Sequence, residues 1–254
     1  LVIGDAAQAI DSYYNDDLSG SEYPWHKRLK RHDTHYPLGG IGHLGCFSFH
    51  ETKNIQCGEG GMLTINDPHY VRRAEIIWEK GTNRSEFFRG KVNKYEWVDI
   101  GSSFLPSGIT AAFLWAQLEK LRKTQDKRKT LWKMYAEGLR PLAEKGCAAL
   151  PQIPPYATNN AHMFYLVCAS LSERTRLMAH LHANGIQAAT HYLSLHNSAF
   201  YKDKCKSPPL ANCERYVNCL LRLPLFYELE PKHVERVIAS VRAFYGIGGS
   251  LSRA

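Results

Sequence analysis

The sequence contains no long apolar run. None of its hydrophobic stretches approaches the ~20 residues that a membrane-spanning helix needs. The first ten residues, LVIGDAAQAI, have neither a basic region nor a cleavage signature, so no signal peptide is indicated. Internal repeats are also absent. We therefore predict a cytoplasmic protein without a membrane span.

The cysteines form no CxxC pair, and their number, seven, is odd. Free thiols in a reducing compartment are the simplest interpretation of this pattern. His, Cys and acidic residues never cluster at the spacing of zinc ligands, so no metal site is expected.

Acidic charge is in the minority, and the formal net charge is +8. This excess suits an anionic partner such as a nucleotide or a phosphate, but a solvated basic surface explains it equally well. The basic runs 26–31 and 122–129 lack the regularly interleaved aromatic residues of a groove for single-stranded nucleic acid. We therefore expect no nucleic-acid partner.

The chain also lacks an initiator Met, and residues 1–5 are typical of the end of a buried strand. This beginning predicts that the start of the parent protein is missing. The 254 residues present, 44% of them hydrophobic, suffice for one large or two modest domains. A long helix from Ser107 has a charged middle at 122–129, as expected of a helix that leaves one domain and enters another. We place the boundary between residues 1–125 and 126–254.

Hydrophobic periodicity and turn residues predict alternating strands and helices. In the first half we expect strands at 1–5, 44–49 and 62–65, a helix at 68–80 with Val71, Ala74 and Ile77 or Trp78 as its apolar positions, a long connection at 81–106, and the helix from Ser107 with Ile109, Phe113 and Ala116 on one side. In the second half we expect strands at 161–168, 186–192 and 221–226, a helix capped by Ser172 and ending at Asn184-Gly185, a loop at 193–209, and helices at 211–220 and from Pro231.

Three residues of the first half together have the chemistry to hold one cofactor. Lys53 lies just before the glycine cluster 58–61, Ser48 precedes it, and Asp5 ends the first strand. An amine forms a Schiff base with an aldehyde, a carboxylate pairs with a protonated pyridine nitrogen, and a hydroxyl binds a phosphate, which are the needs of pyridoxal phosphate. Each residue alone has a commoner explanation: a solvated lysine, a helix N-cap and an ordinary strand residue.

Several stretches carry a resemblance that favours the cofactor. GDAAQ, GHLGCFSFHETKN, GEGG and HYLSLH resemble the DegT/DnrJ-type sugar-nucleotide aminotransferases. The resemblance implies an aspartate aminotransferase-like α/β fold (PLP fold type I), with 1–125 as part of the large cofactor-binding domain and 126–254 as a smaller C-terminal α/β domain. EKGTNRSEFFRGKVNKYEWVDIGSS, AAFLWAQLE, NAHMFYL and LLRLPLF are most similar to members that aminate a dTDP-linked 4-keto-6-deoxy sugar with glutamate.

The resemblance assigns roles around pyridoxal 5'-phosphate. Lys53 would bind the cofactor covalently and move protons at the substrate carbon. Asp5 would keep the pyridine nitrogen protonated, because a carboxylate paired with that cation keeps both groups charged. Ala7 would pack on the ring face, Gln8 would hydrogen-bond the phenolic oxygen, and Ser48 would bind the phosphate.

Substrate contacts and assembly follow from the same resemblance. His191, Tyr192 and His196 would lie near the sugar nucleotide, and Arg84 and Arg89 would meet its phosphates. Aromatic residues and histidines in such loops are often structural, and arginines on a long loop are often solvated, so both interpretations stay open. A homodimer with its active sites at the interface is expected.

Three features separate this sequence from the family. Residues 18–37 form an insertion after GDAAQ, and Ser194 and Gly108 stand where the family usually has Pro and an acidic residue. Members also carry a further N-terminal portion with a phosphate-binding loop. Because that portion is missing here, an alternative from another class is a catalytically silent fragment, or half of a split enzyme, that acts as an assembly partner.

Overall fold

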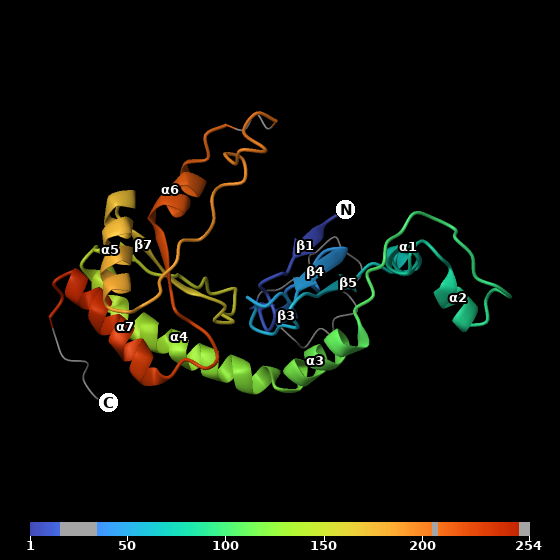
Figure 1. Cartoon of the computed structure of the whole chain (residues 1–254), viewed down its shortest axis with the longest axis horizontal. Helices are drawn as coiled ribbons and strands as arrows, with labels where there is room; N and C mark the ends of the chain where they lie inside the picture. The colour runs from blue at the N-terminus through green and yellow to red at the C-terminus, as the bar shows by residue number, and fades with distance from the viewer. Residues whose placement is uncertain (16–34, 205–207, 249–254) are drawn as a thin grey trace. The chain divides into compact units, whose positions relative to one another are not determined.

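The structure is a computed structural model that describes residues 1–15, 35–204 and 208–248. The chain folds into two compact units (Figure 1). The first unit comprises Leu1–Lys123 with Pro154–Asn160, and the second comprises Thr124–Ile153 with Ala161–Ala254. Within the described ranges, no helix is both long and apolar enough to cross a membrane. The predicted insertion at 18–37 and the basic run at 26–31 lie outside these ranges, apart from residues 35–37.

A three-stranded sheet forms the centre of the first unit, with β1 (Ile3–Asp5), β4 (Leu44–Ser48) and β5 (Gly61–Ile65) side by side in that order (Figure 1). β1 and β4 are parallel, with Asp5 opposite Cys46, whereas β4 and β5 are antiparallel, with Ser48 opposite Gly61. Gly45 allows a close approach here, because a Cβ at this position would lie within 2.2 Å of the Gly39 carbonyl oxygen.

The first strand is not buried, contrary to the prediction. The side chains of Leu1, Val2 and Ile3 are all exposed. β1 is the outer strand of its sheet, and among the described residues only β4 pairs with it. The apolar side chains at the start of the chain are suited to contact other apolar groups. Among the described residues, however, none covers them.

A short ribbon that the sequence did not predict joins distant parts of the first unit. β2 (Tyr13–Tyr14) pairs with β3 (Tyr36–Pro37), and Tyr14 forms a further bridge to Ala157. The Tyr13 backbone N–H donates to the Thr158 hydroxyl at 2.8 Å. Segment 154–160 thereby belongs to the first unit although the chain around it belongs to the second.

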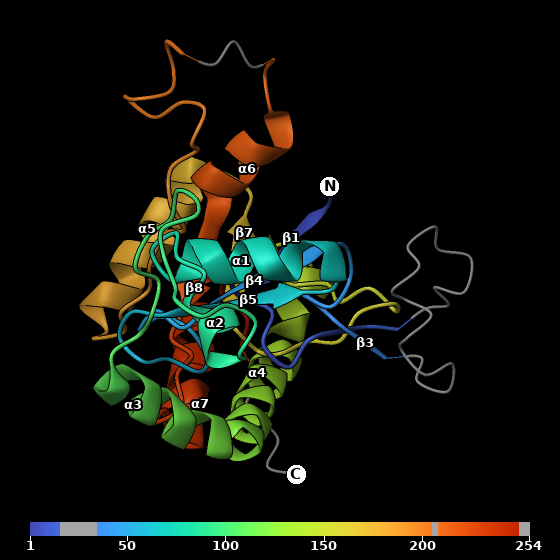
Figure 2. The same cartoon turned by 90° about the vertical axis from the view of Figure 1, so that its right-hand side faces the viewer.

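The helix predicted at 68–80 starts as a 3₁₀ turn, η2 (Pro68–Tyr70), and continues as α1 (Val71–Trp78). The predicted apolar face is right only in part: Ala74 and Ile77 are half-buried. Val71 and Trp78 are exposed, and Ile76, which was not predicted, is the buried residue of the helix. α2 (Arg84–Phe88) interrupts the long connection predicted at 81–106. Both views place α2 beside α1 (Figures 1 and 2), where the Arg72 guanidinium donates to Glu86 at 2.8 Å.

The long helix predicted from Ser107 is two helices, α3 (Gly108–Glu119) and α4 (Leu121–Glu144), which are interrupted at Lys120. The Ser107 hydroxyl caps α3 by accepting the Thr110 N–H at 3.1 Å. No residue of α3 is buried, and Ile109 and Phe113 of the predicted apolar side are exposed. α4 contributes buried side chains to the second unit, Leu131, Tyr135 and Leu139 among them.

The second unit has an antiparallel sheet of β6 (Ala148–Ala149), β7 (Phe164–Cys168) and β8 (Leu220–Leu223) in that order. α5 (Leu171–Ala183), α6 (Ala211–Cys219) and α7 (Pro231–Phe244) contribute the remaining helices. Its core combines α4, the sheet, α5 and α7, and the Tyr135 ring stacks on Phe164 with centroids 5.1 Å apart.

Two local predictions for the second unit are wrong. Ser170, not Ser172, caps α5, because Ser170 and Glu173 have the spacing of a capping box and the Ser170 hydroxyl accepts the Glu173 N–H. Residues 186–192 form no strand, and their backbone pairs with β8 at an isolated Ala189–Arg222 bridge. Ile186 and Ala188 are buried in the core although their backbone is not part of a strand. Their apolar side chains therefore did not indicate a strand.

Candidate functional site

The sheet of the first unit brings two predicted site residues to one edge. Asp5 is the last residue of β1, and Ser48 is the last residue of β4. Because the two strands are parallel, their carboxyl ends share one edge of the sheet. Ligands of α/β folds bind outside such carboxyl edges, where the loops that follow the strands supply functional groups.

The GDAAQ loop turns sharply after β1. The Ala7 N–H donates to Asp5 Oδ1 at 3.0 Å, and the Ala6 N–H donates to the Cys46 carbonyl at 2.9 Å. Ala6 is buried, whereas Asp5 and Gln8 are exposed and Ala7 is half-buried. No Lys, Arg or His among the described residues forms an ion pair with Asp5, so its second carboxylate oxygen stays available to a cationic group.

Lys53 lies in the turn between β4 and β5. Its backbone N–H donates to the His50 carbonyl at 2.9 Å, and its side chain is half-buried. The Ser48 hydroxyl accepts the His50 N–H at 3.3 Å, so the two predicted site residues share one hydrogen-bonded turn. Gly58 closes the turn at φ +79°, a conformation that favours glycine.

Asn160 ties the two loops together, which the sequence reasoning missed. Its side-chain amide donates to the carbonyls of Gln8 at 2.7 Å and Ile10 at 2.9 Å. The backbone carbonyl of Asn160 accepts a hydrogen bond from the Asn54 side-chain amide at 2.9 Å, and both asparagines are buried. The GDAAQ loop and the Lys53 turn are therefore held to a common anchor. Asn160 begins the NAHMFYL stretch and Asn54 follows Lys53, which were the signals in the sequence.

This set of groups suits pyridoxal phosphate in type and placement. The Asp5 carboxylate ends β1, and the Gln8 amide follows it in the GDAAQ loop. The Ser48 hydroxyl ends β4, and the Lys53 amine follows it. Asp5 is free to accept a hydrogen bond from a protonated pyridine nitrogen. No cluster of three or more potential metal ligands occurs within the described part of the chain.

The three predicted substrate residues on the HYLSLH loop belong to the second unit. His191 Nδ1 lies 3.2 Å from the Arg222 guanidinium, and the His191 and Tyr192 rings lie 4.6 Å apart. Tyr192 adopts a positive φ of 49° and is 71% exposed. His196 Nε2 lies 3.3 Å from the Glu214 carboxylate. His191 and His196 thus have structural partners, whereas the Tyr192 ring projects into solvent.

Arg84 and Arg89, the predicted phosphate ligands, both belong to the α2 region. Arg89 forms a bidentate pair with Glu75, with its Nη1 at 2.8 Å from one carboxylate oxygen. This pair raises the pKa of Arg89 and gives the residue a structural role between α1 and α2. The Arg84 guanidinium lies over the Phe88 ring, 5.1 Å from its centroid.

A sequence model of the DegT/DnrJ/EryC1/StrS aminotransferase family matches residues 1–242. The aminotransferase TlmJ from Streptoalloteichus hindustanus superposes with a TM-score of 0.78 at 23% identity, over 96% of this chain and 58% of that one. DesV from S. venezuelae superposes with a TM-score of 0.75 at 27% identity, over 95% and 57%. Spr1654 from Streptococcus pneumoniae, a proposed sugar aminotransferase, was solved in a PMP form, with a TM-score of 0.76 at 20% identity over 97% and 57%.

These structures share the α/β fold of the aspartate aminotransferase class, which confirms the predicted fold class. The chain spans less than two thirds of the length of each of them.

Proposed function

Because the chain belongs to the DegT/DnrJ/EryC1/StrS aminotransferase family, whose enzymes depend on pyridoxal phosphate, we propose that it acts as a sugar aminotransferase. The observation that carries the proposal is the pair of loops at the carboxyl edge of β1 and β4. One presents Asp5 and Gln8, the other presents Lys53 beside Ser48, and Asn160 joins them.

When bound, pyridoxal phosphate supplies an aldehyde and a pyridinium ring that accepts electrons from the substrate carbon. Lys53 Nζ would hold the cofactor through the aldehyde carbon, and the Lys53 amine, once released from that carbon, would move the proton at the substrate carbon. The second oxygen of Asp5 would accept a hydrogen bond from the ring nitrogen and so keep it protonated. Gln8 would bind the phenolic oxygen, Ser48 would bind the phosphate, and Ala7 would pack on the ring.

The proposed acceptor is a dTDP-linked 4-keto-6-deoxy sugar, and glutamate is the proposed donor, as in a dTDP-4-amino-4,6-dideoxygalactose transaminase. The supporting observations are the EKGTNRSEFF and HYLSLH stretches. Among the candidate contacts, Tyr192 has an exposed ring and Arg84 forms no carboxylate pair in the described structure, so these two are best suited to meet substrate. A homodimer in the cytoplasm remains part of this proposal.

Covalent trapping tests the assignment of Lys53. The chain is incubated with pyridoxal phosphate, reduced with borohydride and digested, and the label should appear on the peptide that contains Lys53. Lys53→Ala should abolish labelling and glutamate-dependent turnover, whereas Lys94→Ala, an exposed lysine of the same unit, should change neither. A label on another peptide would contradict the assignment.

A second candidate function is assembly with a further polypeptide, and the exposed apolar surface of the first unit favours it. All of α3 is unburied, with Trp115 66% exposed and Ile109 85% exposed, and Met62 and Leu63 of β5 are also exposed. Groups of exposed large apolar side chains often mark interaction sites. The two functions are separated by visible cofactor absorbance: a band that glutamate bleaches supports catalysis by this chain, and its absence supports assembly alone.

A further inference from the structure

The second unit contains a cleft of about 500 Å³ along the edge of β8, which we call the basic cleft. Its polar lining comprises Arg222, His162, Gln187, His233 and Arg236. None of the described residues that line it is Asp or Glu. A concave site with two arginines and no carboxylate attracts anions.

The backbone explains why a cleft forms here. Ala189 and Arg222 exchange two backbone hydrogen bonds, at 3.1 and 2.8 Å, which join the 185–189 segment to β8. Beyond this bridge the two chains are not paired, because β8 ends at Leu223 and Pro224 has no N–H to continue the ladder. The gap between residues 185–188 and 223–229 is therefore part of the fold of the second unit alone.

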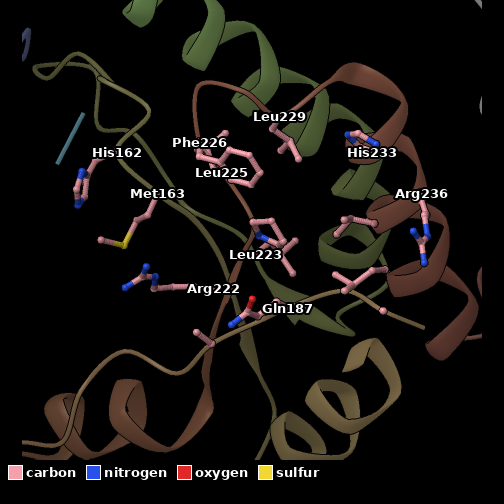
Figure 3. A pocket seen from close by; sticks show the side chains of 15 residues that line it. His162, Met163, Gln187, Arg222, Leu223, Leu225, Phe226, Leu229, His233 and Arg236 are labelled. Carbon is pink, nitrogen blue, oxygen red and sulfur yellow. The ribbon is translucent and has the colours of Figure 1, made fainter. Parts of the chain in front are cut away.

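The two ends of the basic cleft carry separate arginines. Arg222 lies on one side of the apolar side chains of Leu223 and Leu225, and His233 with Arg236 lies on the other (Figure 3). Arg222 is half-buried, and its described side-chain contact is His191 Nδ1 at 3.2 Å. Since arginine stays protonated, this nitrogen of His191 acts as the acceptor, and the other donors of Arg222 remain for a ligand.

The far end is positioned by α7. Arg236 donates to the Asn184 carbonyl, which holds its guanidinium beside the cleft while other N–H groups stay exposed. His233 lies in the first turn of the same helix. Glu230, which precedes α7, is paired with Lys232 at 2.6 Å and does not line the cleft.

The middle of the cleft is apolar. Leu225, Phe226 and Leu229 line it between the two charged ends. Contact between water and these apolar side chains is unfavourable. A ligand with a hydrocarbon chain between two anionic groups therefore fits the cleft better than a hydrated inorganic ion does. Planar guanidinium groups match carboxylates, which they bind through two parallel hydrogen bonds.

We propose that the basic cleft binds a small organic dicarboxylate, with one carboxylate on Arg222 and the other at His233 and Arg236. The site belongs to the second unit and does not rest on the proposed aminotransferase activity.

Calorimetry with the full 254-residue chain, without cofactor, tests the proposal with glutarate as the probe. We expect saturable binding with one site per chain, and weaker binding of butyrate, which has one carboxylate. A charge-assisted hydrogen bond contributes enough that Arg222→Gln and Arg236→Gln should each weaken glutarate binding by about tenfold. Arg222→Lys, which keeps the charge but loses the fork, should lose less.

Lys145→Gln is the matched control, because it removes one exposed positive charge of the second unit outside the cleft. It should bind glutarate as the unsubstituted chain does. The proposal is overturned if glutarate gives no saturable binding to the folded chain, or if neither arginine variant weakens it. An effect at only one arginine, equal affinity for butyrate, or equally tight binding of inorganic phosphate would each overturn the two-ended dicarboxylate assignment.

Discussion

The two units differ in how they are held together. The second unit has a continuous apolar core in which Tyr135, Phe164 and Leu221 have no exposed surface. Among the described residues of the first unit, only Ala6, Phe49, Ile55 and Ile76 are buried and apolar, and this unit is bound largely by backbone ladders and asparagine contacts. The second unit therefore has the features of an independently stable domain, whereas the first displays apolar surface suited to a partner.

The largest expected effect comes from matched phenylalanines. Phe164→Ala removes a fully buried ring that packs on Tyr135 and Trp132, and it should cost about 3–5 kcal/mol of unfolding free energy. Phe113→Ala, on exposed α3, should cost less than about 0.5 kcal/mol. Urea unfolding followed by circular dichroism measures both. Equal losses of unfolding free energy in the two variants would contradict the inferred difference in packing between the two units.

Asn160 tests whether polar contacts hold the first unit. Asn160→Ala leaves the Gln8 and Ile10 carbonyls without this donor, which should cost about 1–3 kcal/mol of local stability. Hydrogen exchange should therefore rise in peptides that cover residues 6–12 and 49–56. Asn184→Ala, which loses an exposed hydrogen bond at the end of α5, is the control and should leave these peptides unchanged.

Cys168 should make the second unit sensitive to alkaline pH. Burial raises the pKa of Cys168 from 9.0 to about 11. Between these values only the unfolded chain loses the thiol proton, so this contribution to stability is complete below pH 9 and is lost as pH rises towards 11. The urea midpoint of the unsubstituted chain should decrease from pH 8 to pH 10.5. This decrease should be smaller in Cys168→Ala. Cys46→Ala, at an exposed thiol of the first unit, should keep the original decline.

The smallest effect is expected at the surface pair of α1 and α2. Arg89→Ala breaks the bidentate contact with Glu75, yet both side chains are solvent-accessible, so the melting temperature should fall less than in Phe164→Ala or Asn160→Ala. Thermal unfolding measures the fall, and the swapped pair Arg89→Glu with Glu75→Arg should restore part of it. A fall as large as that of Asn160→Ala would mean that the pair, not the sheet, holds α2 in place.

Much of the secondary structure was predictable because local signals suffice for it. The strands at 44–48 and 61–65 and the helix from Pro231 appear where alternation, glycine turns and an N-terminal proline indicated them. The errors share a cause. Ile186 was predicted to lie in a strand and Val71 on the buried face of a helix, because both are apolar. An apolar residue type does not reveal which neighbour, if any, covers the side chain.

For the candidate site, sequence motifs indicated Lys53, Asp5, Gln8 and Ser48, and their roles remain predictions. The contacts of Asn160 could not be foreseen, since it lies far along the chain from Gln8 and meets it only because segment 154–160 returns to the first unit. The engagement of Arg89 by Glu75 was equally invisible, because it depends on how α2 packs beside α1.

By itself the sequence determined the family, the fold class and the order of most elements, since these follow from local motifs and hydrophobic periodicity. Only the tertiary structure decided which apolar residues are covered, that Asn160 joins the GDAAQ loop to the Lys53 turn, and that the unpaired edge of β8 opens into a basic cleft. The reason is physical: periodicity is a property of neighbouring residues, whereas burial and charge pairing depend on which distant segments the fold brings together.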